Sequence, residues 1–189
     1  MSQPESIDSE LIALAQSGDA DAFSTLTTLH EGRLLCTALT LTRDAHLAED
    51  IVQETFTEAW RSLARFDGRC RFTTWLHAIL VHRSYKAVRH AASRPRLPTP
   101  HEGSQPEAID PHSPAHAALQ REAAEQLRDA VAALPGEHRA VIELRFFADC
   151  ALDEIAAALD VPLGTVKSRL HHALEKLRGM NLFAAARES

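Results

Sequence analysis

The sequence predicts an all-α protein with two small helical domains joined by a proline-rich linker, the second of them a helix-turn-helix domain. Apolar residues recur at helical spacing in one segment after another, and no segment shows the strict two-residue alternation of a half-buried strand. Six of the 9 prolines lie between Ala92 and Ala118, where they remove backbone donors and disfavour helix. The composition, with 7 glycines and 5% aromatic residues, disfavours β-sandwiches and barrels. We therefore expect a first domain at residues 1–92, a linker at 93–118, a second domain at 119–180 and a tail at 181–189.

The first domain contains four predicted helices, at residues 11–15, 23–35, 48–63 and 72–88. The third is the clearest, because its apolar residues fall at offsets 0, 3, 4, 8, 11, 12 and 15 from Ala48 and so form one stripe. Asp44 is suited to cap the start of this helix. The polar residues 17–19 end the first helix, and a break at 66–71 separates the third helix from the fourth.

The second domain also contains four predicted helices, at residues 119–134, 138–147, 152–159 and 162–177. Asp160 and Val161 form a tight link between the last two, and Pro162 suits a first helical position because its missing N–H would be unpaired there. Two short helices joined by a tight turn, the second of them basic, are typical of a helix-turn-helix.

Charge is sorted along the chain, although the net charge is only −6. Residues 1–60 carry 2 basic and 11 acidic side chains, and residues 97–162 carry 4 basic and 12 acidic ones. Two basic islands interrupt this acidic background, with 9 basic and 1 acidic side chains at 61–96 and 4 basic and 1 acidic at 163–178. Islands of this kind indicate contact with an anion at two places, although a solvated helix face is the ordinary alternative for either one.

The first basic island is interleaved with the aromatic residues Phe66, Phe72, Trp75 and Tyr85. Basic side chains for the backbone together with aromatic surfaces for stacking are what binding of single-stranded nucleic acid requires. The loop at 66–71 is of a kind that can receive an unstacked base. The alternative is that Phe72 and Trp75 are core residues at helical spacing.

One polar face of the last predicted helix carries Thr165, Ser168, Arg169 and His172, with Lys167 on its flank. A helix fits the major groove of B-DNA, where arginine can fork onto guanine and small hydroxyl residues can contact base edges or phosphates. Further cations toward the end of the helix would contact backbone phosphates. The alternative is a surface helix whose cationic end complements the helix dipole.

Three stretches, taken in this order, resemble the extracytoplasmic-function (ECF) group of bacterial RNA polymerase sigma factors: AEDIVQETFTEAW, FDGRCRFTTWLHAIL and LPGEHRAVIELRFFADCALDEIAAALDVPLGTVKSRLHHALEKLR. The resemblance implies an alternative sigma factor without catalysis or cofactor of its own. It further implies that core RNA polymerase and promoter DNA, both duplex and melted single strand, are partners, and that an anti-sigma protein holds the factor inactive.

The resemblance also assigns residues to these roles. Core polymerase is expected to bind Asp50, Gln53 and Glu54, which lie on the acidic face of the third predicted helix. The minus-ten promoter element is expected to contact Phe66, Arg69, Arg71, Arg83, Lys86 and Arg89. The minus-thirty-five element is expected to contact Thr165, Lys167, Ser168, Arg169 and His172. Without the resemblance, the acidic face fits either a basic protein partner or simple solvation.

The chain departs from the family pattern at two places. After TWL it reads Ile79-Leu80-Val81-His82 and then Lys86, so base assignments for the minus-ten element are not transferred. Before EIA it has Asp149 and Ala151 where the family places a glycine and a capping Ser or Thr. Loss of a cap costs about 1 kcal/mol, and we expect either that the start of this helix shifts or that the helix borrows another oxygen, for which Asp149 is the candidate.

Other functional classes fit the sequence less well. A stand-alone helix-turn-helix regulator with an N-terminal sensor or dimerisation module would need neither the acidic face nor the aromatic and basic loop. The 11 histidines include no HExxH pair, so no metal site is expected.

The cysteines and the apolar runs bear on the compartment. Three cysteines without a CxxC pair exclude a disulfide framework, and Cys70 beside two arginines fits either a redox switch or, better, a bystander thiol. No apolar run of about 18 residues is present, so no membrane insertion and a cytoplasmic location are expected.

Overall fold

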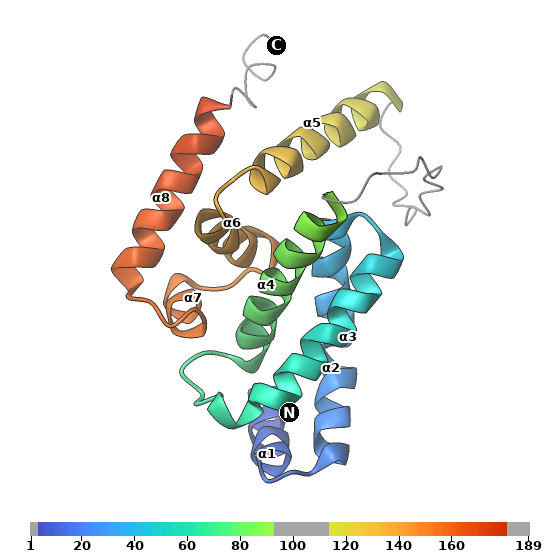
Figure 1. Ribbon diagram of the computed structural model, residues 1–189, viewed down its shortest axis with the longest axis vertical. Helices are drawn as coiled ribbons and strands as arrows, with labels where there is room; N and C mark the ends of the chain where they lie inside the picture. The colour runs from blue at the N-terminus through green and yellow to red at the C-terminus, as the bar shows by residue number, and fades with distance from the viewer. Residues whose placement is uncertain (1–3, 93–113, 181–189) are drawn as a thin grey trace.

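The computed structural model describes residues 4–92 and 114–180, and this described part consists of helices and their connections, without a strand (Figure 1). The first domain comprises α1 (Pro4–Gln16), α2 (Ala20–Thr42), α3 (Ala45–Ser62), a short 3-10 turn η1 (Leu63–Arg65) and α4 (Phe72–Ala92). The second comprises α5 (Pro114–Ala132), α6 (Gly136–Ile142), a π-helical turn η2 (Glu143–Phe147), α7 (Leu152–Ala158) and α8 (Leu163–Gly179). The all-α prediction and the helix-turn-helix, formed by α7 and α8, are confirmed.

Polar side chains define where the helices of the first domain begin. The carboxylate of Asp19 accepts hydrogen bonds from the backbone N–H groups of Asp21 and Ala22, at 2.9 and 3.0 Å. Asp44 accepts from the backbone N–H of Leu47 at 3.0 Å, so its predicted role as the cap of α3 is confirmed. Each cap satisfies donors that the first helical turn leaves unpaired.

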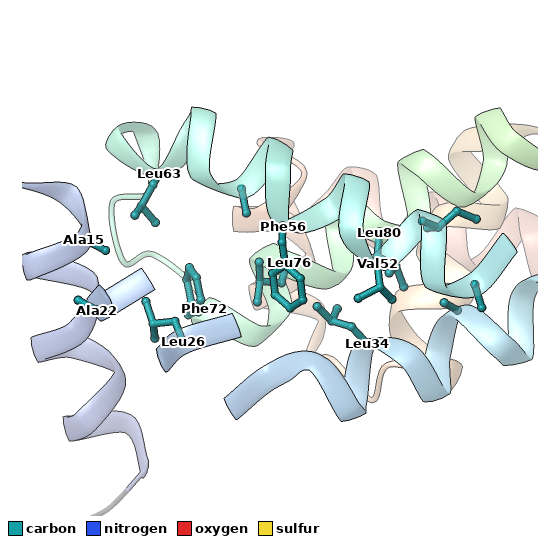
Figure 2. Close-up of a cluster of buried hydrophobic side chains, with 14 residues drawn as sticks. Ala15, Ala22, Leu26, Leu34, Val52, Phe56, Leu63, Phe72, Leu76 and Leu80 are labelled. Atoms are coloured by element: carbon teal, nitrogen blue, oxygen red, sulfur yellow. The ribbon is translucent and has the colours of Figure 1, made fainter. Parts of the chain in front are cut away.

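The core of the first domain lies between α2, α3 and α4, with α1 closing one end (Figure 2). Its fully buried members include Leu26, Leu34, Ile51, Leu76 and Leu80. The predicted stripe of α3 faces this core with one exception, Trp60, which is 39% exposed and lies against Phe23 with ring centroids 4.9 Å apart.

The second domain packs α6 and α7 against α8. The inward residues of α8 include Val166, Ala173 and Leu177, all buried as predicted. The helix begins at Leu163, because Pro162 has a ψ of 144° and lies at the cap instead of the first helical position. Helix α5 already begins at Pro114, inside the predicted linker, since a proline is tolerated in the first turn of a helix. The rest of that linker, residues 93–113, lies outside the described residues.

The cap of α7 differs from the expectation. Asp149 adopts a left-handed backbone with φ of 51° and does not cap the helix. Instead, the Glu154 carboxylate accepts a hydrogen bond from the backbone N–H of Ala151 at 3.2 Å. This contact is the glutamate half of a capping box, and the other half, in which a hydroxyl at the cap position accepts an N–H of the first turn, is absent because Ala151 has no side-chain oxygen.

Helix α4 lies between the two domains (Figure 1). One of its faces packs on α2 and α3, and the other contacts α6, η2 and α7. Val81 of α4 is buried in one cluster with Val141, Leu144, Ile155 and other residues of the second domain. The domains therefore share an apolar core, which the sequence did not predict.

Candidate functional site

The exposed face of α3 forms an acidic strip made of Glu49, Asp50, Gln53, Glu54, Thr57 and Glu58. All of these side chains are exposed except that of Glu58, which is half-buried. Four residues of the strip line an open pocket together with Arg61 and Arg83, namely Asp50, Gln53, Glu54 and Thr57. The predicted polymerase-binding residues Asp50, Gln53 and Glu54 are thus brought together on one surface.

Arg83, predicted to contact the minus-ten element, lies at the acidic strip. From α4 it donates to Glu58 at 2.7 Å and to Glu54 at 3.5 Å. Lys86, one turn further along α4, is exposed to solvent. The side chain of Arg89 lies outside the described residues. The structure therefore separates Arg83 from the loop residues with which the sequence grouped it.

The loop at 66–71 is held by aromatic packing and by its own hydrogen bonds. The ring of Phe66 is half-buried and lies 5.5 Å from that of Phe72 and 5.2 Å from that of Trp75. The Asp67 carboxylate accepts from the backbone N–H of Arg69 at 3.1 Å and from its side-chain Nε at 2.5 Å. The backbone hydrogen bond from Arg69 lowers the pKa of Asp67.

Two arginines of this loop reach carboxylates of the second domain. Arg71 forms two hydrogen bonds to Glu154, of 2.5 and 2.7 Å, in a forked arrangement. Arg69 places both terminal nitrogens 3.3 Å from Asp160. The pKa of Glu154 is lowered, mainly because its carboxylate accepts the hydrogen bonds from Arg71. Sequence reasoning did not find these carboxylates as partners, because they are 83 and 91 residues away.

The predicted DNA-reading face of α8 is largely open. Lys167, Ser168 and His172 are exposed, and Thr165 is half-buried. Arg169 forms an ion pair with Glu137 of α6, and its side chain is 22% exposed. The predicted residues therefore share one surface, on which Arg169 is already engaged by a carboxylate.

The second domain contains a buried ion pair. Arg139 of α6 donates from Nε to Glu143 at 2.5 Å, and their side chains are only 5% and 1% exposed. The Arg139 guanidinium also lies over the ring of Tyr85 of α4, 5.6 Å from its centroid. Burial raises the pKa of Glu143, and Arg139 opposes that rise. The sequence analysis missed this pair, for which the spacing of four residues was the available signal.

The thiols do not have the character of a redox switch. Burial, assisted by nearby carboxylates such as Glu154, raises the pKa of Cys70 to about 11. Burial also raises the pKa of Cys150. A thiol with a raised pKa is a poor nucleophile at neutral pH, which favours the bystander interpretation of Cys70.

Within residues 4–92 and 114–180, no group of three or more His, Cys, Asp or Glu side chains is arranged to hold a metal ion. No helix within these residues is long and apolar enough to cross a membrane.

Comparison with known families matches both domains. Residues 26–94 match Sigma-70 region 2, and residues 130–179 match Sigma-70, region 4. The RNA polymerase sigma-H factor of Pseudomonas aeruginosa is 30% identical over 179 residues, which cover 90% of this chain and 91% of that protein. The ECF RNA polymerase sigma factor SigL of Mycobacterium tuberculosis is 34% identical over 165 residues, covering 87% and 91%.

Solved structures share the fold. A structure of CnrH in complex with the cytosolic domain of CnrY superposes with a TM-score of 0.63 at 24% identity, covering 97% of this chain and 99% of that one. The sigma factor RpoE of Bartonella quintana, solved with the anti-sigma factor NepR, gives a TM-score of 0.52 at 24% identity, covering 83% and 94%.

Proposed function

The chain belongs to the ECF RNA polymerase sigma factors and is an alternative sigma factor, and from this premise we propose which of its surfaces meet polymerase and promoter. The acidic strip of α3 docks on core RNA polymerase through Asp50, Gln53 and Glu54. The loop at 66–71 and α4 contact the minus-ten element. The outer face of α8 contacts the minus-thirty-five element.

The observation that carries the docking proposal is the geometry of the acidic strip. Its carboxylates are exposed on one face of a helix whose opposite face is fixed in the core by Ile51, Val52 and Phe56. A rigid row of carboxylates repels DNA and attracts a basic protein surface. Arg83, which lines the same pocket, holds Glu54 and Glu58 in place through ion pairs.

Binding to purified bacterial core RNA polymerase tests this proposal. We expect the folded chain to bind, and a variant carrying Asp50→Arg and Glu54→Arg to lose about 100-fold or more in affinity, because a charge that loses its partner at an interface costs 2–5 kcal/mol, roughly. The matched control carries Glu10→Arg and Glu31→Arg, two exposed positions on α1 and α2 with the same change in net charge.

Two outcomes would contradict the assignment. Equal losses in the variant and the control would show that net charge, not the acidic strip, governs binding. Absence of binding by the folded chain, free of any copurified partner, would favour a stand-alone DNA-binding regulator.

Promoter reading divides between the domains. Of the residues assigned to the minus-thirty-five element, Lys167, Ser168 and His172 are exposed, and Arg169 must exchange Glu137 for DNA. Selection of duplex DNA from a random pool by the complex with core polymerase tests this assignment. Arg169→Ala should relax selection at one base position, whereas Lys167→Ala should weaken binding across sequences. Uniform weakening by both variants would contradict base reading by Arg169.

An anti-sigma protein is the further partner we propose, because CnrH was solved with the cytosolic domain of CnrY and RpoE with the anti-sigma factor NepR. We also propose that the chain catalyses no reaction of its own and acts in the cytoplasm, where polymerase initiates transcription. Copurification of the tagged chain from its native cell would reveal the anti-sigma partner.

A further inference from the structure

The two domains contact each other through an apolar surface of α4. Val81 of α4 is 3% exposed, and the other buried members of its cluster, which include Val141, Leu144 and Ile155, belong to the second domain. Leu41 and Ala78 of the first domain also pack against this cluster, whereas Leu76 and Leu80 belong to the core of the first domain. Helix α4 carries two apolar faces, one for each domain.

Three ion pairs also join the two domains, and all of them have the same direction of charge. Arg71 binds Glu154, Arg69 binds Asp160, and Arg43 at the end of α2 lies 3.4 Å from Asp129. In each of these pairs the first domain supplies the arginine and the second the carboxylate. The two segments are complementary in charge overall, with 9 basic and 1 acidic side chains at 61–96 against 4 basic and 12 acidic at 97–162.

The carboxylate of Glu154 contacts Arg71 in the way that a phosphate group can. The two hydrogen bonds from Arg71 to Glu154 have the forked geometry with which arginine also binds a phosphate group. A guanidinium held in this way has its forked edge on Glu154 and cannot present that same edge to a DNA backbone. Glu154 is fixed in place because it also accepts the backbone N–H of Ala151 at the start of α7.

We propose that the second domain is an internal inhibitor of the first, whose carboxylates at Glu154 and Asp160 hold Arg69 and Arg71 away from single-stranded DNA until the domains separate. The proposal rests on the proposed function, because it takes Arg69 and Arg71 as contacts to the minus-ten element. Closure itself does not depend on that assignment. The promoter strand and the second domain compete for the same two arginines.

Small-angle X-ray scattering and DNA binding of the full-length chain test the proposal together. The variant Glu154→Gln with Asp160→Asn removes both charges but keeps an oxygen that can cap α7. The matched control, Asp149→Asn with Asp153→Asn, neutralises two exposed aspartates of the same domain. The DNA probe is a fluorescein-labelled single-stranded pool of random sequence.

We expect the wild-type chain and the control to be compact, with a radius of gyration near that of a globular protein of this length, about 16 Å before the contribution of the linker. The variant should increase the radius of gyration by several Å and bind the probe about tenfold more tightly. Val81→Asp disrupts the apolar contact and leaves the arginines unchanged. This variant should also show the larger radius of gyration and the tighter binding of the probe, while circular dichroism shows that its helices persist.

Three outcomes would overturn the proposal. An expanded wild-type chain would exclude a closed resting state. Unchanged scattering by both the charge variant and a folded Val81→Asp variant would show that these contacts do not hold the domains together. If the variant expands but does not bind DNA more tightly, the wild-type chain is closed but closure does not inhibit DNA binding. In that case the assignment of Arg69 and Arg71 to the minus-ten element is wrong.

Discussion

The buried ion pair between Arg139 and Glu143 supports a quantitative prediction about stability. Replacing Arg139 by methionine keeps a long apolar stem but leaves the Glu143 carboxylate, 1% exposed, without its charged partner. Breaking a buried pair on one side costs about 3–5 kcal/mol, because the remaining charge stays desolvated. A loss of that size is a large share of the about 5–15 kcal/mol by which ordinary domains are stable.

The pH dependence of this loss follows from the same burial. Burial raises the pKa of Glu143 in the folded chain above its value in the unfolded chain. Between those two values the folded chain holds a proton that the unfolded chain has released, so stability falls as pH rises through the interval. Without Arg139 the pKa rises further, and the destabilisation should therefore shrink when the pH is lowered from 7 toward the ordinary range of a glutamate.

Urea unfolding followed by circular dichroism measures both effects. The double variant Arg139→Met with Glu143→Leu removes the pair completely and should be within about 1 kcal/mol of wild type or more stable, because apolar replacements of buried pairs are often neutral. A single variant that loses less than about 1 kcal/mol would refute the reasoning. A double variant as unstable as the single one would assign the loss to packing instead of charge.

Other predictions concern individual side chains. Asp44→Ala should cost about 1 kcal/mol of stability in urea unfolding, because its 3.0 Å hydrogen bond to the Leu47 N–H is lost, while Asp44→Ser should recover most of it. Burial lowers the pKa of His77, so stability should fall as pH drops below the ordinary histidine range, and His77→Gln should flatten that slope in melts across pH; an unchanged slope would exclude His77 as its source. Ile155→Ala, at a fully buried site, should cost about 2–5 kcal/mol, and a loss below about 1 kcal/mol would show that the site refills. Because burial raises the pKa of Cys70 to about 11 and Cys36 is exposed, iodoacetamide should alkylate Cys36 first at neutral pH, as peptide mass analysis would report; the reverse order would contradict the bystander interpretation.

The helices themselves were predictable, because their signals are local. The stripe of α3 gave its buried residues correctly except for Trp60, which is 39% exposed and packs against Phe23 near the start of α2. Caps were predictable where a side chain reaches the next turn, as with Asp44. The prediction that Asp149 caps α7 was wrong, because Asp149 adopts a left-handed backbone and the side-chain contact at this end is instead that of Glu154 with the N–H of Ala151.

The candidate surfaces were partly predictable. Residues on one helix stay together, so the acidic strip and the face of α8 appear in the structure as the spacing indicated. The group assigned to the minus-ten element did not stay together. Arg83 lies with the acidic strip, whereas Arg69 and Arg71 reach the second domain. Helical periodicity places a residue on a face but does not say which charge of another helix faces it.

The sequence by itself determined the helical class, the order of the elements, the helix-turn-helix and the family to which the chain belongs, since all of these depend on residue types at short spacings. The tertiary structure alone decided that the two domains share the apolar contact around Val81 and that the loop arginines bind carboxylates 83 and 91 residues away. Such contacts depend on how whole helices pack and on which charged side chains that packing brings together. A pattern of residues at short spacing specifies neither.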